Sequence, residues 1–186
     1  MEFDIQSCVQ YEVAEGPLKA EMIKILGGAN FFSGGPVVLI RLNLSEYDEV
    51  FTSKIPGFYE KLKELIPSLY DHHCSIGAPG GFLQRVQEGT LLGHVAEHVA
   101  IELQTLAGMD VAFGKTRSTL TPGVYHLVFR FFDEIAGIYA GKAAISLINS
   151  ILTSKDFNIT ETIANLIQIR EHRMLGPSTQ AIVDEA

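Results

Sequence analysis

The segment from Leu92 to Leu106 has two chemically opposite faces, and this pattern constrains the fold more than any other part of the chain. On an ideal helix, which turns by about 100° per residue, apolar side chains fall on one half and polar side chains on the other. The apolar half consists of Leu92, Val95, Val99, Leu103 and Leu106, and the polar half of His94, Glu97, His98 and Glu102. Such a helix is stable only when its apolar face packs against another layer. We therefore predict a core helix that begins at Thr90 as its N-cap and ends before Gly108.

The remaining hydrophobic pattern predicts the layer against which this helix packs. Short apolar segments bounded by glycine, proline or polar residues are typical of strands. The predicted strands are 21–26, 37–44, 111–118 and 123–132, and residues 1–20 are left unplaced. Helical spacing recurs between Pro56 and Pro67, from Glu134 to Leu152, and after Asn158, which forms a capping-box-like start with Glu161.

These elements predict an α/β (α+β) fold, with a mixed or antiparallel sheet packed with helices. The last two helices are joined by a short connection, so we expect an antiparallel helical hairpin. The chain is accordingly divided into a core domain, 1–133, a helical hairpin, 134–174, and a tail, 175–186.

Composition excludes several classes of protein. Apolar residues make up 47% of the chain and charged residues 19%, which is typical of a globular protein. A formal net charge of −8 argues against a nucleic-acid binder. A membrane-spanning helix needs about 18 uninterrupted apolar residues, and the sequence has no such run. Cys8 and Cys74 are far apart and no signal peptide precedes them, so we expect a cytoplasmic protein with reduced thiols.

The polar face of the predicted core helix has the order His-x-x-Glu-His. Residues four apart lie one above the other, so His94 and His98 can reach a single ion. A Zn²⁺ ion held by two neutral imidazoles needs a third protein ligand and leaves a fourth position for water. The metal lowers the pKa of that water towards about 7, and Glu97 is placed to take its proton. This is the H-x-x-E-H order of inverted zinc peptidases.

Three residues compete for the position of third ligand. Glu134, at the start of a later helix, is preferred because H-x-x-E-H peptidases use a downstream carboxylate, while His72 and Cys74 compete from the upstream loop. Glu102 lies about 6 Å of axial rise beyond His98, so we expect it to orient His98 rather than bind the ion. The alternative to a metal site is the polar face of an ordinary surface helix.

Five further residues are candidate contacts for a substrate. Arg117 and Arg85 can grip carboxylates through bidentate pairing, and His72 lies in a polar loop. Gly80 and Gly81 can allow a substrate backbone to approach closely. Solvated charges, local ion pairs and a plain turn explain the same residues equally well.

The segment from Asp71 to Ser118 contains the longest ordered set of motifs, "DHHCSIGAPGGFLQRVQEGTLLGHVAEHVAIELQTLAGMDVAFGKTRS". With "IPGF" before it and "PGVYHLVF" and "LGPSTQAIVDEA" after it, the chain resembles the N-terminal domain of cyanophycin synthetase, from about Ile23 onward. The resemblance implies a link to cyanophycin, a polymer with an aspartate backbone whose side chains carry arginine. Synthesis in that family belongs to ATP-grasp and Mur-ligase-like domains that follow this one. This sequence has no phosphate-binding loop, so we do not expect synthesis by this chain alone.

The resemblance also implies roles for individual residues. The family's N-terminal domain is associated with holding the growing polymer, and in some members it resembles a metallopeptidase that cuts the polymer into primers. By that likeness His94 and His98 match the metal ligands and Glu97 matches the base.

Three candidate functions from different classes follow from these observations. The leading one is a zinc-dependent hydrolase that binds and cleaves a cyanophycin-like polymer. The alternative is a non-catalytic module that anchors polymer for the synthetase. A third reading is a scaffold that forms homo-oligomers through the helical hairpin. Neither nucleic acid nor membrane is expected as a partner.

Overall fold

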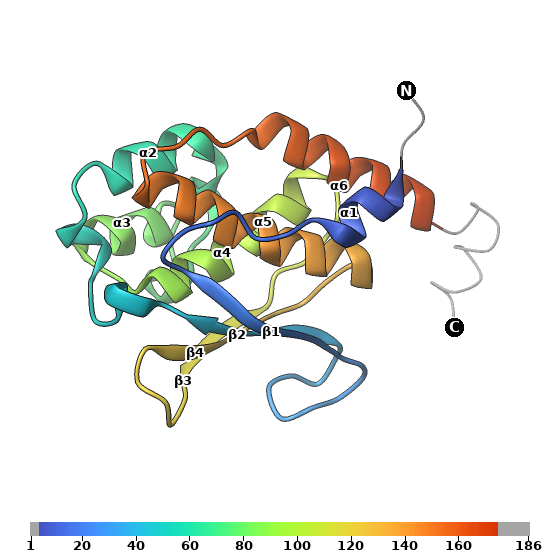
Figure 1. The fold of residues 1–186 in the computed structure, drawn as a ribbon, viewed down its shortest axis with the longest axis horizontal. Helices are drawn as coiled ribbons and strands as arrows, with labels where there is room; N and C mark the ends of the chain where they lie inside the picture. The colour runs from blue at the N-terminus through green and yellow to red at the C-terminus, as the bar shows by residue number, and fades with distance from the viewer. Residues whose placement is uncertain (1–3, 175–186) are drawn as a thin grey trace.

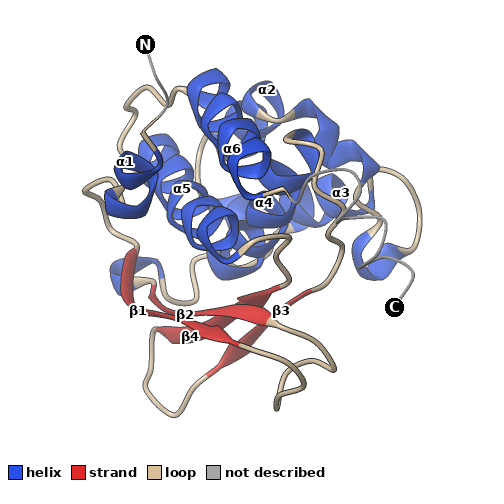
Figure 2. Ribbon diagram, turned by 90° about the vertical axis from the view of Figure 1, so that its right-hand side faces the viewer, coloured by secondary structure: helices blue, strands red, loops and turns tan. Residues whose placement is uncertain are grey.

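The computed structural model describes residues 4–174 and consists of one four-stranded antiparallel sheet with helices on one face (Figure 2). The strand order is β1-β2-β4-β3. The strands are β1 Lys19–Leu26, β2 Val37–Asn43, β3 Gly114–Ser118 and β4 Val124–Phe129. This confirms the predicted α+β class and shows that the sheet is antiparallel rather than mixed.

Alternation along the central strand β2 gives the sheet two apolar faces. Val38, Ile40 and Leu42 point into the main core beneath the helices. Val37 and Leu39 point the other way and form a small second cluster with Val128 of β4, packed against Met22, Leu26, Phe32 and Phe113. Because both faces of β2 are buried, its sequence reads as a continuous apolar run.

Two long helices, α4 and α5, lie between the sheet and the outer helix α6 (Figure 1). They span Leu92–Leu106, Glu134–Leu152 and Ile159–Arg173, respectively. Gly137 and Gly141 let α5 approach the sheet closely, since a Cβ at these positions would lie 2.8 Å from Val38 Cγ2 and 2.6 Å from Ile40 Cδ1. Among the described residues α5 is the one helix long and apolar enough to cross a membrane, but 72% of its apolar window is buried inside the fold.

The antiparallel hairpin of α5 and α6 is present. Arg173 at the end of α6 donates to Asp133, the N-cap of α5, at 2.9 Å, which brings opposite ends of the two helices together. Asn158 is the N-cap of α6 and accepts from the backbone N–H of Glu161, as the capping signal predicted. Buried residues of both helices belong to the same core cluster as the sheet, so no gap in the core separates 134–174 from the preceding residues. The predicted tail, 175–186, falls outside the described residues.

Short helices complete the helical layer. They are α1 Ile5–Gln10, α2 Phe58–Leu65 and α3 Gly81–Glu88. Only α2 was predicted from the sequence. Between α2 and α3 the chain forms two short 3₁₀ segments, η3 Pro67–Asp71 and η4 Cys74–Ile76. We call residues 67–80 the covering loop, because they contact α3 and α4 and place polar side chains over α4.

Candidate metal centre

Helix α4 supplies most of the site, and its start differs from the prediction. The N-cap is Leu91, and no side chain caps the helix. The Thr90 hydroxyl lies 2.9 Å from His94 Nδ1 instead. At the other end Gly108 adopts the left-handed conformation expected of a residue that ends a helix, with φ +77°.

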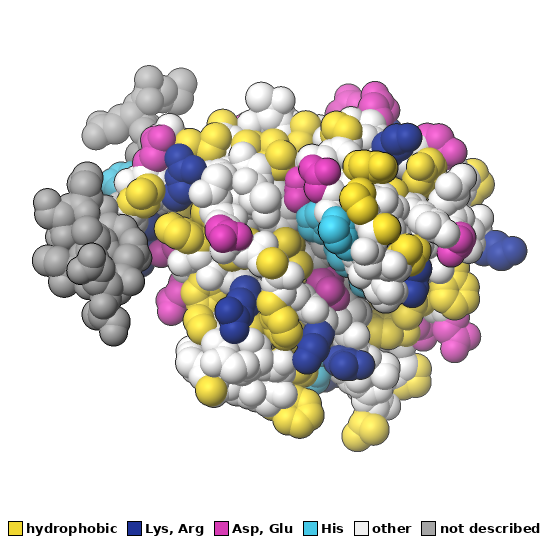
Figure 3. Space-filling model, turned by 180° about the vertical axis from the view of Figure 1, so that it is seen from behind, with side chains coloured by type: hydrophobic (Ala, Val, Ile, Leu, Met, Phe, Trp, Pro, Cys, Tyr) yellow, Lys and Arg dark blue, Asp and Glu magenta, His cyan; other side chains and the backbone are white. Residues whose placement is uncertain are grey.

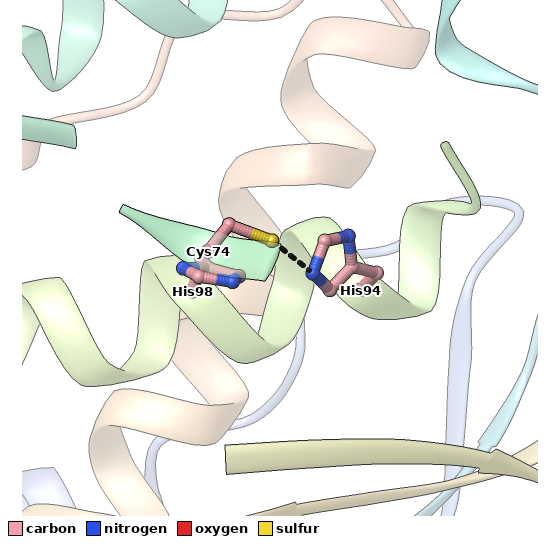
Figure 4. Close-up of side chains that lie close together, drawn as sticks. All are labelled: Cys74, His94 and His98. Atoms are coloured by element: carbon pink, nitrogen blue, oxygen red, sulfur yellow. Dashed lines mark hydrogen bonds between the residues drawn. The ribbon is translucent and has the colours of Figure 1, made fainter. Parts of the chain in front are cut away.

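Three possible metal ligands meet above α4. The ligand atoms of Cys74, His94 and His98 all lie within 4.8 Å of one another. Figure 4 shows both imidazoles projecting from α4 and Cys74 approaching from the covering loop, with its Sγ 3.4 Å from His94 Nε2. A thiolate and two imidazoles are ligands that Zn²⁺ prefers. The residues therefore fit the predicted metal: the cluster contains His94 and His98, both predicted as ligands, and Cys74, one of the competing candidates for the third.

Both imidazoles are held in the neutral form that metal binding requires. Burial lowers the pKa of His94 to about 4, and the nearby Arg85 charge adds to this. Burial also lowers the pKa of His98 to about 3, with further contributions from His94 and His72. Phe82 of α3 stacks on the His98 ring, with centroids 4.1 Å apart and planes inclined by 20°.

Glu97, on the same helix, is buried between α4 and β3. Its side chain accepts a 2.7 Å hydrogen bond from the Thr116 hydroxyl. Gly114 makes room for it, because a Cβ there would lie 2.5 Å from Glu97 Cγ. Burial raises the pKa of Glu97 to about 7, although the Thr116 hydrogen bond and the nearby Arg117 charge act against the increase. A carboxylate with a pKa near neutrality suits a general base.

Glu102 is predicted to orient His98, and the structure connects the two only through His72. Its Oε2 lies 2.6 Å from His72 Nε2, and His72 Nδ1 in turn lies 2.8 Å from His98 Nδ1. Both ring nitrogens of His72 are thus engaged, which leaves it no nitrogen for a metal or a substrate. Glu97 and Glu102 are only 7% and 3% exposed, so α4 is not an ordinary surface helix.

The structure does not bring Glu134 into the cluster. Gln104, near the C-terminal end of α4, hydrogen-bonds the backbone of Arg130 and Phe132, and this holds the start of α5 at that end. Gln104 is ten residues beyond His94, which corresponds to roughly 15 Å of axial rise. The first turn of α5 therefore starts far from His94, and Cys74 rather than Glu134 lies with the two imidazoles.

Two cavities adjoin the cluster, and both are lined by Cys74, Ser75 and His94. The larger, of about 710 Å³, is also lined by Arg85 and Arg117. The smaller, of about 500 Å³, is lined by all three possible ligands and by the residues Asp71, His72, His73, Glu97, Ile101, Thr105, Val111, Ala112 and Gly114. Figure 3 shows histidine side chains gathered on this face, between Asp or Glu side chains above and Lys or Arg side chains below.

Gly80 and Gly81, predicted to contact substrate, line neither cavity. Gly80 has φ +80° and faces the Tyr70 ring, while a Cβ on Gly81 would meet the backbone carbonyl of His73. Their geometry matches the turn alternative, in which they let α3 pack under the covering loop. Arg85 lies beside the cluster, where its Nη1 donates to Ser75 Oγ at 3.0 Å.

Sequence reasoning missed three residues that shape the site. Thr90 was interpreted as a cap, Thr116 was passed over within a predicted strand, and Phe82 belongs to a helix that was not predicted. The alternation of β3 contained a usable signal, because it places Thr116 on the face opposite Lys115 and Arg117.

Comparison with known proteins identifies the family. The family model "Cyanophycin synthase-like N-terminal domain" matches residues 39–153. The chain is 47% identical over 166 residues to a cyanophycin synthetase of Synechocystis sp., covering 87% of this chain and 19% of that protein. It is 45% identical over 174 residues to a cyanophycin synthetase of Geminocystis herdmanii, covering 91% of this chain and 20% of that protein. A third cyanophycin synthetase, of Trichormus variabilis, is 47% identical over 169 residues, covering 88% of this chain and 19% of that protein. The chain thus spans about a fifth of the length of these relatives, and it belongs to the family of cyanophycin synthase-like N-terminal domains.

Proposed function

We propose that this chain binds a cyanophycin-like polymer and hydrolyses it at a zinc centre formed by Cys74, His94 and His98. The observation that supports the proposal is the convergence of three ligand atoms within 4.8 Å, two of them on neutral imidazoles. The cleaved fragments would serve as primers for synthesis by the rest of a longer synthetase, of which relatives of this chain are examples.

Bound at these three ligands, Zn²⁺ would polarise a substrate carbonyl and make water acidic. Glu97 lines the same cavity and, when ionised, takes the proton from the attacking water. Glu97 then passes that proton to the amine released when the C–N bond breaks, which balances the hydrolysis. Thr116 holds the carboxylate in place through its 2.7 Å hydrogen bond.

Arg85 and Arg117 are proposed to bind carboxylates of the polymer. Both line the larger cavity beside the cluster. Guanidinium groups pair with carboxylates in a bidentate geometry, which fixes orientation as well as adding affinity. Arg117 also lies near Glu97 and can stabilise negative charge that develops at the cleaved amide.

A second candidate, the non-catalytic binding module, is favoured by the same arginines. The larger cavity has two basic side chains regardless of whether a metal is bound. In this case the chain would anchor the polymer while other domains extend it.

One experiment separates the two candidates. The purified chain is incubated with cyanophycin, with and without a strong chelator, and the fragments released are measured by mass spectrometry. Glu97→Gln removes the base, and Glu64→Gln serves as the matched control because Glu64 is exposed and lines neither cavity beside the cluster. Polymer retention is measured in parallel by sedimentation.

Hydrolysis predicts fragments that disappear with chelator and in Glu97→Gln but persist in Glu64→Gln. If the chain retains polymer but releases no fragments in any condition, the result would refute hydrolysis and support the binding module. Fragments that form equally in Glu97→Gln would refute the role of this centre.

A further inference from the structure

Glu102, His72 and His98 form a linear chain of hydrogen bonds that ends at a metal ligand. Glu102 Oε2 and His72 Nε2 are 2.6 Å apart, and the two Nδ1 atoms of His72 and His98 are 2.8 Å apart. The side chains of His72 and Glu102 are only 14% and 4% exposed, so water competes little for these bonds.

The chemistry of the groups sets the direction of each bond. An ionised carboxylate can only accept, so His72 must donate to it from Nε2. When His72 is neutral it has one ring proton, so its Nδ1 then has a free lone pair and accepts from His98 Nδ1–H. The proton of His98 is thereby fixed on Nδ1, and its Nε2 has the lone pair that a metal needs.

We propose that Glu102 and His72 act as a positioning relay that fixes His98 in its metal-binding tautomer. The proposal rests on the proposed metal centre and adds two residues that do not touch the ion. It extends the familiar carboxylate–histidine–zinc arrangement by one imidazole.

The contrast with His94 shows why the relay matters at His98 alone. His94 Nδ1 faces the Thr90 hydroxyl at 2.9 Å. A hydroxyl can donate or accept, so this contact permits either tautomer of His94. Only the hydrogen-bond chain of His98 ends at a carboxylate, that of Glu102, which can only accept when it is ionised.

A purely structural role would predict different behaviour. Buried Glu102 needs a donor, and His72 supplies one, so the pair also satisfies a buried charge. On that view, substitutions of His72 would change stability without changing the tautomer of His98 or the metal affinity of the folded chain.

The test compares His72→Phe with His72→Gln in the full chain. Phenylalanine removes both hydrogen bonds, whereas a glutamine amide can donate to Glu102 and accept from His98, so it is the conservative rescue. Zinc affinity is measured by competition with a chromophoric chelator. The tautomer of His98 is read from ¹⁵N chemical shifts of the metal-free wild-type chain at about pH 8, above the ordinary histidine pKa of about 6.5.

We expect His72→Phe to lower zinc affinity by about 10- to 100-fold and His72→Gln to restore most of it. We also expect wild-type His98 to be protonated on Nδ1. Protonation on Nε2, or unchanged affinity in folded His72→Phe, would overturn the relay. A wild-type chain that binds no zinc would instead overturn the metal centre, and the ¹⁵N spectrum would still decide the relay.

Discussion

Replacement of Glu97 by glutamine should stabilise the metal-free chain at high pH. Glu97 is 7% exposed, and burial raises the pKa of its carboxyl from 4.5 to about 7. The carboxylate is therefore less stable in the folded protein than in the unfolded chain. Glutamine has the same shape, removes the charge and keeps an oxygen that can accept from Thr116.

The magnitude follows from the difference in pKa between the two states. A raised carboxyl pKa means that the folded state holds its proton more tightly, so stability falls as pH rises from 4.5 to about 7 and is constant above that. Each pKa unit corresponds to about 1.4 kcal/mol, so ionised Glu97 costs about 3 kcal/mol at about pH 9. At about pH 4.5 the same cost is below about 0.5 kcal/mol.

Urea unfolding at these two pH values, with chelator present, measures the effect. We expect Glu97→Gln to gain about 3 kcal/mol over wild type at about pH 9 and almost nothing at about pH 4.5. Glu64→Gln should show no comparable pH-dependent gain, because the side chain of Glu64 is 70% exposed. An equal difference between Glu97→Gln and wild type at both pH values would refute the inference that burial of this carboxyl is costly.

Three further predictions concern the ligands, the covering loop and the substrate. Cys74→Ala should lower zinc affinity by at least about tenfold, measured by chelator competition. Cys8→Ala should leave the affinity unchanged because Cys8 is in the core, and equal losses in the two variants would exclude Cys74 as a ligand. Gly81→Ala should destabilise the chain by about 1–3 kcal/mol in urea unfolding, since its Cβ would meet the carbonyl of His73; an unchanged midpoint would count against this packing. Arg117→Ala should weaken cyanophycin binding about tenfold in a sedimentation assay, with Lys24→Ala as an off-site control, and undiminished binding would remove Arg117 from the substrate site.

The fold could be predicted where periodicity was unambiguous. The predicted helix from Glu134 to Leu152 has the same ends in the structure, and Asn158 begins the last helix as its capping signal indicated. The strand predicted for 111–118 begins only at Gly114, because the preceding three residues do not pair with β4. Helix α3, Gly81–Glu88, was missed because its glycine-rich start was interpreted as part of a loop.

The candidate site was predictable only within one element. Spacing along a single helix shows that His94 and His98 share a face, since helical geometry is local. The third ligand comes from a different element, and its position depends on how the covering loop folds back over α4. The local sequence does not contain the distance between loop and helix, so it could not decide which of Cys74, His72 and Glu134 lies beside the two imidazoles.

The covering loop contributes both the third possible ligand and part of the electrostatics of the site. On an isolated helix, solvent would keep His94, Glu97 and His98 near their ordinary pKa values. In the structure burial is the largest cause of all three pKa shifts, and residues of the covering loop line the same cavity as these side chains. The loop therefore supplies the Cys74 sulfur and also helps to exclude the water that would hold the imidazoles and the carboxyl at ordinary pKa values. A substitution that lifts the loop should consequently remove the Cys74 sulfur and return the pKa values of the two imidazoles towards 6.5 together, whereas loss of the thiol alone should change only metal binding.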